Sequence, residues 1–314
     1  MLRCAVLDDY QGVALGLADW SKVRATSFRE HFADQDALVA ALLDHEIVVI
    51  MRERTPFTAE LFARLPKLRL LVTSGMRNAA VDLDAARAHG VTVCGTASGS
   101  TPPVELTWAL ILGLTRHLLP EAGAMRSGGP WQSTLGTDLH GRTLGLLGLG
   151  KIGSRVAEVG RAFGMDVVAW SRHLTEERAT AAGARLAASK EELLSGSDIV
   201  SVHLVLSERT RGLVGERELA LMRPTAYLVN TARAAIVDQD ALVSALSAGR
   251  IAGAGLDVFE VEPLPAGHAF RRLPNVLATP HLGYVSELNY RTYFREAVED
   301  IEAFLDQAPI RRLA

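Results

Sequence analysis

Short apolar runs rich in β-branched residues recur along the chain and alternate with stretches of helical periodicity. Ten of these runs are candidate strands, at residues 3–7, 47–50, 70–73, 91–94, 143–147, 166–170, 199–203, 226–230, 253–257 and 276–278. Several are apolar at nearly every position, as in strands that are covered on both faces. Helical patterns lie between them at 33–43, 58–64, 83–89, 189–194 and 239–248. This alternation predicts an α/β protein with doubly wound parallel sheets.

Length and charge narrow the class further. The 314 residues suggest two domains. The formal net charge of -3, without a basic run, argues against nucleic acid or an anionic membrane as a partner. Cys4 and Cys94 stand in apolar runs without metal-ligand spacing, so we expect buried thiols, no metal site and a reducing, cytoplasmic location. The N-terminus does not have the pattern of a signal peptide.

Three further segments organise the chain. The small, Gly- and Pro-rich stretch at 94–103 is the best candidate for a hinge. From Glu105 to residue 119 we expect one long helix, apolar nearly all round, that is buried inside the protein or at a subunit contact. Residues 124–140 read as a loop, and residues 288–305 return to a helical period.

The strongest local motif lies within residues 143–170, TLGLLGLGKIGSRVAEVGRAFGMDVVAW. Gly148, Gly150 and Gly153 form G-x-G-x-x-G between a strand-like and a helix-like run. In a dinucleotide-binding loop the first glycine permits the tight turn, the second admits the pyrophosphate, and the third lets helix and strand pack closely. A motif of this kind also occurs in ordinary turns, but its flanking elements favour a cofactor loop.

The end of the next strand bears on the choice of cofactor. NAD-binding chains often carry a carboxylate about 20 residues after the glycines, which binds the ribose hydroxyls. Here the corresponding residues are Ser171 and Arg172, and neither is acidic. An arginine suits a 2′-phosphate, so NADP is favoured over NAD, unless Arg172 is only a solvated loop charge.

Three polar residues stand a few positions beyond predicted strands. Arg233 follows the strand at 226–230, Glu262 lies in the loop after 253–257, and His281 follows the strand at 276–278. Ligands of open α/β sheets bind outside the carboxyl ends of the strands. Each residue alone could be structural, as an ion-pair partner, a loop carboxylate or a core histidine. Together with the glycine loop they predict a catalytic set.

The sequence resembles the D-isomer-specific 2-hydroxyacid dehydrogenases, which include phosphoglycerate, glycerate, formate and glyoxylate/hydroxypyruvate enzymes. Five motifs carry the resemblance, in the same order and at similar separations over nearly the whole chain. They are GLGKIG at 148–153, VHLVLSERT at 202–210, NTARAAIVD at 230–238, GLDVFEVEP at 255–263 and TPHLG at 279–283.

The resemblance implies an architecture of two Rossmann-like domains. A split substrate domain would comprise residues 1–100 and 285–314, and the inserted dinucleotide-binding domain residues 101–284, with the active site in the cleft. It implies a homodimer whose contact includes the helix after Glu105. Cofactor contacts are expected from Gly148, Gly150, Lys151, Ile152, Gly153, Ser171, Arg172, His203, Leu204, Thr231, Ala232, Arg233, Asp257, His281 and Gly283.

The resemblance also implies a mechanism. The enzyme would transfer a hydride between NAD(P)H and a small 2-keto or 2-hydroxy acid, and would act as a 2-keto acid reductase. His281 would exchange the proton, Glu262 would orient and charge it, and Arg233 would pair with the substrate carboxylate. Alternatives from other classes are a nucleotide-sensing scaffold like the C-terminal-binding-protein corepressors, and another dinucleotide enzyme such as an alanine dehydrogenase or adenosylhomocysteine hydrolase. The complete catalytic set, the short chain and the DVFEVEP and TPHLG motifs disfavour both.

The chain departs from the family in its substrate-binding segments. A glycine-rich turn that binds the substrate carboxylate reads TSGMRNAAVDL here, with Arg77 where a second glycine is common. Arg77, Arg52 and Arg54 could each bind a second anionic group or be solvated loop charges. Residues 234–235 are both alanine where many relatives have glycine. We expect substrate contacts from Arg52, Ser74, Gly75, Met76 and Arg233.

Overall fold

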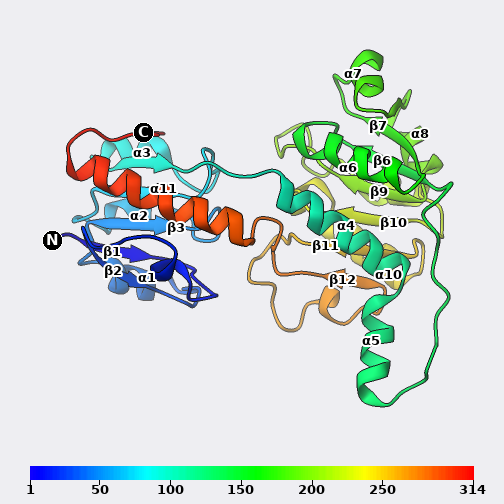
Figure 1. Ribbon diagram of the computed structural model, residues 1–314, viewed down its shortest axis with the longest axis horizontal. Coiled ribbons are helices and arrows are strands. Elements are labelled where there is room, and N and C mark those ends of the chain that lie inside the picture. Colours follow the sequence, from blue (N-terminus) through cyan, green and yellow to red (C-terminus); the bar gives the residue numbers. More distant parts are fainter. The chain divides into compact units, whose positions relative to one another are not determined.

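The computed structural model describes all 314 residues, which divide into two compact units. Unit 1 comprises Met1–Gly99 and Val285–Ala314, and unit 2 comprises Ser100–Tyr284. Each unit is built around one parallel sheet, of five strands in unit 1 and seven in unit 2 (Figure 1). The predicted fold class is therefore confirmed, including the insertion of one unit into a second that is split in sequence.

The sheet of unit 1 has the strand order β2-β1-β3-β4-β5, and all its strands run parallel. β3 and β4 are buried at every position, because helices cover both faces of the sheet. In this order the chain moves from β1 to one neighbour and then to the other, which makes β1 and β3 a topological switch point. The strands are β1 (Arg3–Val6), β2 (Arg24–Ser27), β3 (Ile47–Ile50), β4 (Leu70–Thr73) and β5 (Thr92–Gly95).

Helices cover the two faces of this sheet. Three short helices pack their apolar side chains into one core with the strands, and each begins at an Asp or Thr whose side chain accepts a backbone N–H. They are α1 (Gln35–Leu42), α2 (Ala59–Ala63) and α3 (Leu83–Ala88). The long C-terminal helix α11 (Glu287–Leu305) contacts β4 and β5 and completes the unit from the other end of the chain. A 3-10 turn, η1 (Ala14–Gly16), follows β1.

The sheet of unit 2 has the strand order β12-β11-β10-β9-β6-β7-β8, and it is also parallel throughout. The glycine motif follows β6, and β6 lies between β9 and β7, so the switch point of this sheet falls between β6 and β9. The strands are β6 (Thr143–Leu147), β7 (Asp166–Trp170), β8 (Arg185–Leu186), β9 (Ile199–Val202), β10 (Tyr227–Asn230), β11 (Gly253–Leu256) and β12 (Val276–Ala278).

Two apolar cores lie on the two faces of this second sheet. The first is formed with α4 (Thr101–Thr115), α6 (Lys151–Ala162) and α7 (Glu176–Ala181). The second is formed with α8 (Lys190–Gly196), α9 (Glu216–Leu221) and α10 (Gln239–Ser247). The 3-10 turn η2 (Ala234–Ile236) follows β10, and the 3-10 turn η3 (Ala269–Arg271) precedes β12. Because both faces are covered, side chains on the loops at the strand ends are the ones left accessible for a ligand.

The helix expected from residue 105 to 119 differs from the observed one. α4 begins earlier, at Thr101, because Pro102 and Pro103 fit the first turn of a helix, where an N–H has no partner in the helix. It ends at Thr115, and His117 has a left-handed backbone (φ 50°) that separates it from α5 (Leu118–Ser127). The loop expected from residue 124 therefore starts only after Ser127. The boundary between the units, after Gly99, falls within the segment predicted as a hinge, and hinge motion there stays a prediction.

No helix of the protein is both long and apolar enough to cross a membrane. No group of three or more His, Cys, Asp or Glu side chains is arranged to hold a metal ion.

Candidate active site

The glycine loop of unit 2 has the geometry that close backbone packing requires. Gly148 follows β6 with φ 104°, a conformation that side chains disfavour, and a Cβ there would lie 2.8 Å from the carbonyl carbon and oxygen of His203. A Cβ on Gly153 would lie 2.2 Å from the carbonyl oxygen of Gly148. Gly150 is the N-cap of α6, so the free N–H groups of that helix face the loop. The residues present therefore fit a dinucleotide pyrophosphate.

The neighbour of this loop is the end of β9. The backbone N–H of His203 donates to the carbonyl of Leu147 at 2.8 Å, which ties β9 to β6 at the switch point. Nε2 of His203 lies 2.9 Å from Oγ of Ser201. Burial lowers the pKa of His203 to about 4, so the imidazole beside the glycine loop is neutral near pH 7. A neutral imidazole adds no charge to the place where the cofactor is expected.

The residues expected near the adenosine ribose lie after β7. The carbonyl oxygen of Ser171 accepts a hydrogen bond from the N–H of Leu174. This bond closes a turn over residues 171–174, just before α7. Arg172 occupies the tip of this turn and is exposed. No carboxylate ends β7, as the sequence indicated. The turn therefore leaves a guanidinium accessible at the edge where an NADP 2′-phosphate is expected.

The pair formed by Glu262 and His281 is the most specific feature of unit 2. Oε2 of Glu262 lies 2.6 Å from Nδ1 of His281, and the two side chains are 26% and 17% exposed. The other carboxylate oxygen of Glu262 accepts the N–H of Phe259 at 2.9 Å, which fixes its orientation. A carboxylate held at this distance orients the imidazole ring. The structure thus brings together two of the three residues predicted to be catalytic.

A buried aspartate supports the turn that carries His281. Asp257 directly follows β11 and has no exposed surface. Its carboxylate accepts hydrogen bonds from Oγ1 of Thr279 and from the N–H groups of Leu282 and Gly283, at 2.6, 2.7 and 2.8 Å. Burial raises the pKa of this carboxyl, and its hydrogen bonds oppose that rise. These bonds hold the chain on both sides of His281, whose backbone is left-handed (φ 53°).

Asp257 thus has a structural role in the turn that carries His281. The sequence predicted Asp257 as a cofactor contact, and this contact stays a prediction, because in the structure its three partners all belong to the turn.

Arg233 follows β10, the neighbour of the strand that precedes Glu262. β10 lies beside β11, which lies beside β12, so the residues that follow these strands share the carboxyl edge of the sheet. The carbonyl of Arg233 accepts Nδ2 of Asn230 at 3.0 Å, and Nη1 of Arg233 donates to the carbonyl of Ala232 at 2.7 Å. The side chain is half-buried. Its contact with a substrate carboxylate stays a prediction.

Two contacts in unit 2 involve residues that the sequence analysis did not select. The ring of Tyr284 packs edge-on against the imidazole of His281, with 5.1 Å between ring centroids. Oγ1 of Thr107 on α4 lies 2.8 Å from Oγ1 of Thr231, one of the expected cofactor residues. The sequence holds a signal for the first contact, because the aromatic residue Tyr284 directly follows the TPHLG motif. Nothing in the sequence signalled the second, because 124 positions separate the two threonines.

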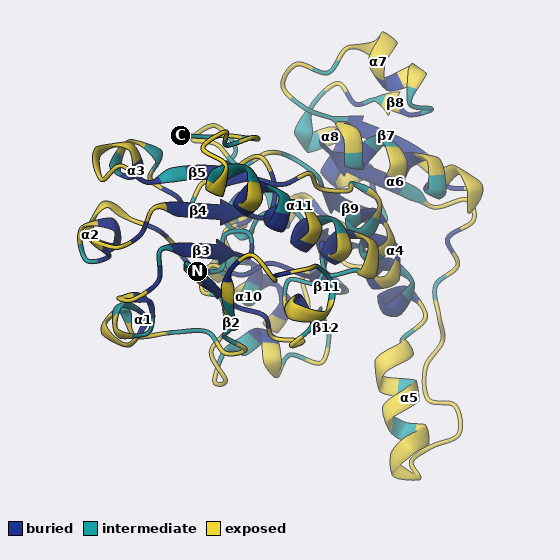
Figure 2. Cartoon of the chain, turned by 60° about the vertical axis from the view of Figure 1, so that its left-hand side comes forward, coloured by how far each residue is buried: buried dark blue, intermediate teal, exposed yellow.

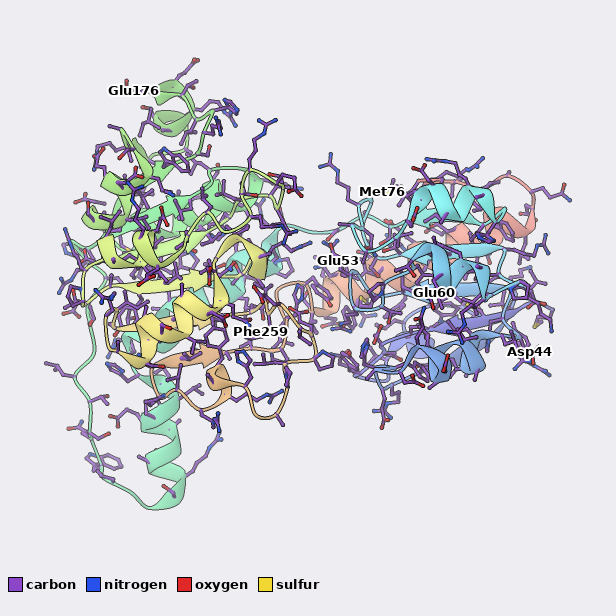
Figure 3. The ribbon with its side chains drawn as sticks, turned by 180° about the vertical axis from the view of Figure 1, so that it is seen from behind. Asp44, Glu53, Glu60, Met76, Glu176 and Phe259 are labelled. Atoms are coloured by element: carbon purple, nitrogen blue, oxygen red, sulfur yellow. The ribbon has the colours of Figure 1, made fainter.

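The substrate residues predicted in unit 1 lie on loops at the carboxyl edge of its sheet. Ser74 and Gly75 follow β4, and their N–H groups already donate to the carbonyl of Ile50 and to Oγ1 of Thr96, both at 3.1 Å. Met76 is 44% exposed, and Figure 3 shows it on a loop at the end of the strands. Of the backbone amides expected to form a carboxylate cradle, two are therefore occupied within the unit. Their binding of substrate stays a prediction.

Comparison with known proteins identifies the family of this chain. Residues 108–283 match the family model for the D-isomer specific 2-hydroxyacid dehydrogenase, NAD binding domain. The chain is 41% identical over 254 residues to a glyoxylate reductase of Aeropyrum pernix, covering 78% of this chain and 76% of that protein. It is 37% identical over 265 residues to a D-3-phosphoglycerate dehydrogenase of Bacillus subtilis, covering 83% of this chain and 50% of that protein. The chain thus spans about half the length of that relative.

The solved structures extend the agreement to both units. The crystal structure of a phosphoglycerate oxidoreductase from Vibrio cholerae superposes with a TM-score of 0.94 at 38% identity, covering 98% of this chain and all of that one. The matched family model and these relatives define an NAD-binding oxidoreductase. The chain belongs to the D-isomer specific 2-hydroxyacid dehydrogenase family.

Proposed function

We propose that this enzyme reduces small 2-keto acids to D-2-hydroxy acids with NAD(P)H. The observation that carries the proposal is the 2.6 Å contact between Glu262 and His281 at the sheet edge that also holds the glycine loop. Acid–base chemistry next to a hydride donor uses both features at one edge. The direction and the D configuration rest on the resemblance to the family.

The roles of the side chains follow from their chemistry. Gly148, Gly150 and Gly153 would hold the dinucleotide, which when bound supplies the hydride. His281, oriented by Glu262, donates its Nε2 proton to the alkoxide oxygen as that oxygen develops, and takes a proton back in the reverse direction. Arg233 pairs with the substrate carboxylate through its planar fork. We also propose substrate contacts from Arg52, Ser74, Gly75 and Met76.

We further propose NADP as the preferred cofactor. The support is the accessible Arg172 next to Ser171, at a strand end that lacks a carboxylate. A ratio of kcat/KM values that clearly favours NADH over NADPH would contradict this preference.

We propose a homodimer as well, and the structure alters where its contact is expected. α4 is largely buried within the chain, so it offers little surface to a partner. α5 has no buried residue (Figure 2), and the chain from it to residue 137 carries large exposed apolar side chains. They are Leu118, Leu119, Met125, Trp131 and Leu135. An exposed apolar patch of this kind usually marks an interface.

The dimer is tested by light scattering during gel filtration. We expect twice the chain mass for the wild type and a shift toward the single-chain mass for Trp131→Glu. Leu288→Glu is the matched control, because Leu288 is also exposed but lies on α11. A wild type that stays at the single-chain mass at micromolar concentration would overturn the dimer.

The enzymatic function is tested by mixing the purified protein with NADH or NADPH and a panel of 2-keto acids. We expect loss of nicotinamide absorbance with at least glyoxylate or hydroxypyruvate. Tight binding of the cofactor without turnover of any acid would contradict the proposal and favour a nucleotide-sensing scaffold.

A further inference from the structure

The loops after β1 and β3 meet at the switch point of unit 1, where an open parallel sheet commonly binds its ligand. The loop after β3 carries Arg52, Glu53 and Arg54 in succession. Two cations flanking one anion at such a position bear on which substrates the proposed reductase accepts. This inference rests on the proposed function and concerns the part of the substrate beyond its keto acid group.

Arg52 is held close to its own unit. Nε of Arg52 lies 3.7 Å from Oε2 of Glu53, and the two side chains are 18% and 23% exposed. Nη1 lies 3.4 Å from the carbonyl of Ser74, and a Cβ on Gly75 would come within 2.2 Å of that nitrogen. The backbone of Arg52 is left-handed (φ 54°), and its carbonyl accepts Nδ2 of Asn78 at 2.6 Å. The guanidinium is therefore packed over Gly75 with Glu53 as an adjacent counter-charge.

Arg54 also has partners within unit 1. Its Nη1 donates to the carbonyl of Asp8 at 2.8 Å, and its guanidinium lies 4.5 Å from the ring centre of Tyr10. The carboxylate of Asp8 is buried and accepts Oγ1 of Thr55 at 2.6 Å, with Nδ1 of His31 at 3.1 Å. This network orients Arg54 by stacking and hydrogen bonding.

The charge of Arg52 is therefore compensated before any ligand arrives. Arg52 faces the carboxylate of Glu53, Arg54 donates to the backbone carbonyl of Asp8, and Arg77, the remaining arginine of these loops, is exposed. A phosphate on the substrate would need positive charge in excess at this edge, because its two negative charges must be compensated as they leave water. Glu53 removes that excess next to Arg52.

We infer that Glu53 determines specificity by excluding 2-keto acids that carry a second anionic group. Its carboxylate neutralises Arg52 and repels a phosphate or second carboxylate at the switch point of unit 1. The substrate class is then short 2-keto acids with an uncharged tail, of the glyoxylate or hydroxypyruvate kind. Loss of the negative charge at Glu53 frees Arg52 for an anion without changing the reaction.

The test compares two acids that differ only in a phosphate, hydroxypyruvate and 3-phosphohydroxypyruvate, with the wild type and Glu53→Gln. The measured quantity is the ratio of kcat/KM for the phosphorylated acid to that for the unphosphorylated acid. We expect the wild type to favour hydroxypyruvate, and Glu53→Gln to raise the ratio by about tenfold or more, since one charge within reach of a dianion supplies that much. Glu53→Ala serves as a second variant if the amide disturbs the loop.

Two controls separate this effect from a general change of charge. Glu60→Gln removes an exposed carboxylate of the same unit, on α2, and is expected to leave the ratio unchanged (Figure 3). The double variant Glu53→Gln with Arg52→Gln is expected to lose the gain, because Arg52 is the cation that Glu53 neutralises.

The inference is overturned if the wild type prefers the phosphorylated acid, or if the ratio for Glu53→Gln and Glu53→Ala stays within threefold of the wild type, a limit of about 0.65 kcal/mol. Turnover of hydroxypyruvate in those cases would leave the proposed function standing. Absence of turnover with either acid and either cofactor would overturn the proposed function, and this inference with it.

Discussion

Oε2 of Glu262 lies 2.6 Å from Nδ1 of His281, although the two residues come from loops that follow different strands. In the proposed mechanism, this contact holds the Nδ1 proton toward the carboxylate and leaves Nε2 to exchange a proton with substrate. Asp257 holds the turn around His281, and the N–H of Phe259 holds Glu262. Both members of the pair are thus fixed by backbone contacts of their own loops.

Removing the charge of Glu262 tests its role in the pair. We expect Glu262→Gln to lower kcat for keto acid reduction by about tenfold to a hundredfold, within the range that proton-transfer catalysis contributes. Cofactor affinity, measured by fluorescence titration, should change little. Equal kcat values for the variant and the wild type would argue that Glu262 is only structural.

The geometry of Gly148 predicts a strong effect of adding one methyl group. Gly148→Ala combines an unfavourable φ of 104° with a Cβ placed 2.8 Å from the backbone of His203. We expect the Kd for NADPH to rise by at least about tenfold, since the loop must move away from β9 to relieve the contact. Gly141→Ala is the control, because Gly141 also has a positive φ of 72° but open space around its Cβ position. If both variants bind the cofactor equally well, the packing argument for this loop fails.

The burial of His203 predicts an acid sensitivity of the fold. Because its pKa is lowered from 6.5 to about 4, the folded state binds fewer protons than the unfolded state between these values. The stability associated with neutral His203 is present above pH 6.5 and is lost as the pH falls toward 4. At pH 4.5 the loss amounts to about 2.5 kcal/mol.

Urea denaturation at pH 7.5 and pH 4.5 measures this loss. His203→Gln should show a smaller decrease in the free energy of unfolding between the two pH values than the wild type, by about that amount. His173→Gln, at an exposed position in the same unit, should retain the full decrease. An identical decrease in His203→Gln and the wild type would contradict the burial of a neutral imidazole.

The sequence predicts ten of the twelve strands, including the edge strands β5 and β12, and the ten candidates agree with the observed strands to within one residue at each end. β2 and β8 were not predicted, because β2 (RATS) contains no apolar run and β8 spans only two residues. Both lack the continuous apolar pattern that identifies strands covered on both faces. The short helices α7 and α9 were also missed.

The sequence likewise identifies some residues of the predicted site and not others. Residues placed directly after a buried strand, such as Gly148 and His281, could be found because a parallel sheet aligns all its carboxyl ends. The supporting role of Asp257 could not be found, because it depends on a turn whose N–H groups return to the carboxylate 25 and 26 positions away. Nor could the pairing of Arg52 with Glu53 be read from adjacency alone, since neighbouring side chains often point apart.

The most direct measurement concerns His281 itself. Because its backbone is left-handed, His281→Asn is the suitable variant, since asparagine tolerates that conformation better than most residues. Steady-state turnover of a 2-keto acid and the Kd for reduced cofactor should be measured side by side. We predict that kcat falls by about 10²–10⁴-fold while the cofactor Kd stays within about threefold of the wild type. Turnover close to that of the wild type would show that the proton comes from elsewhere and would contradict the assignment.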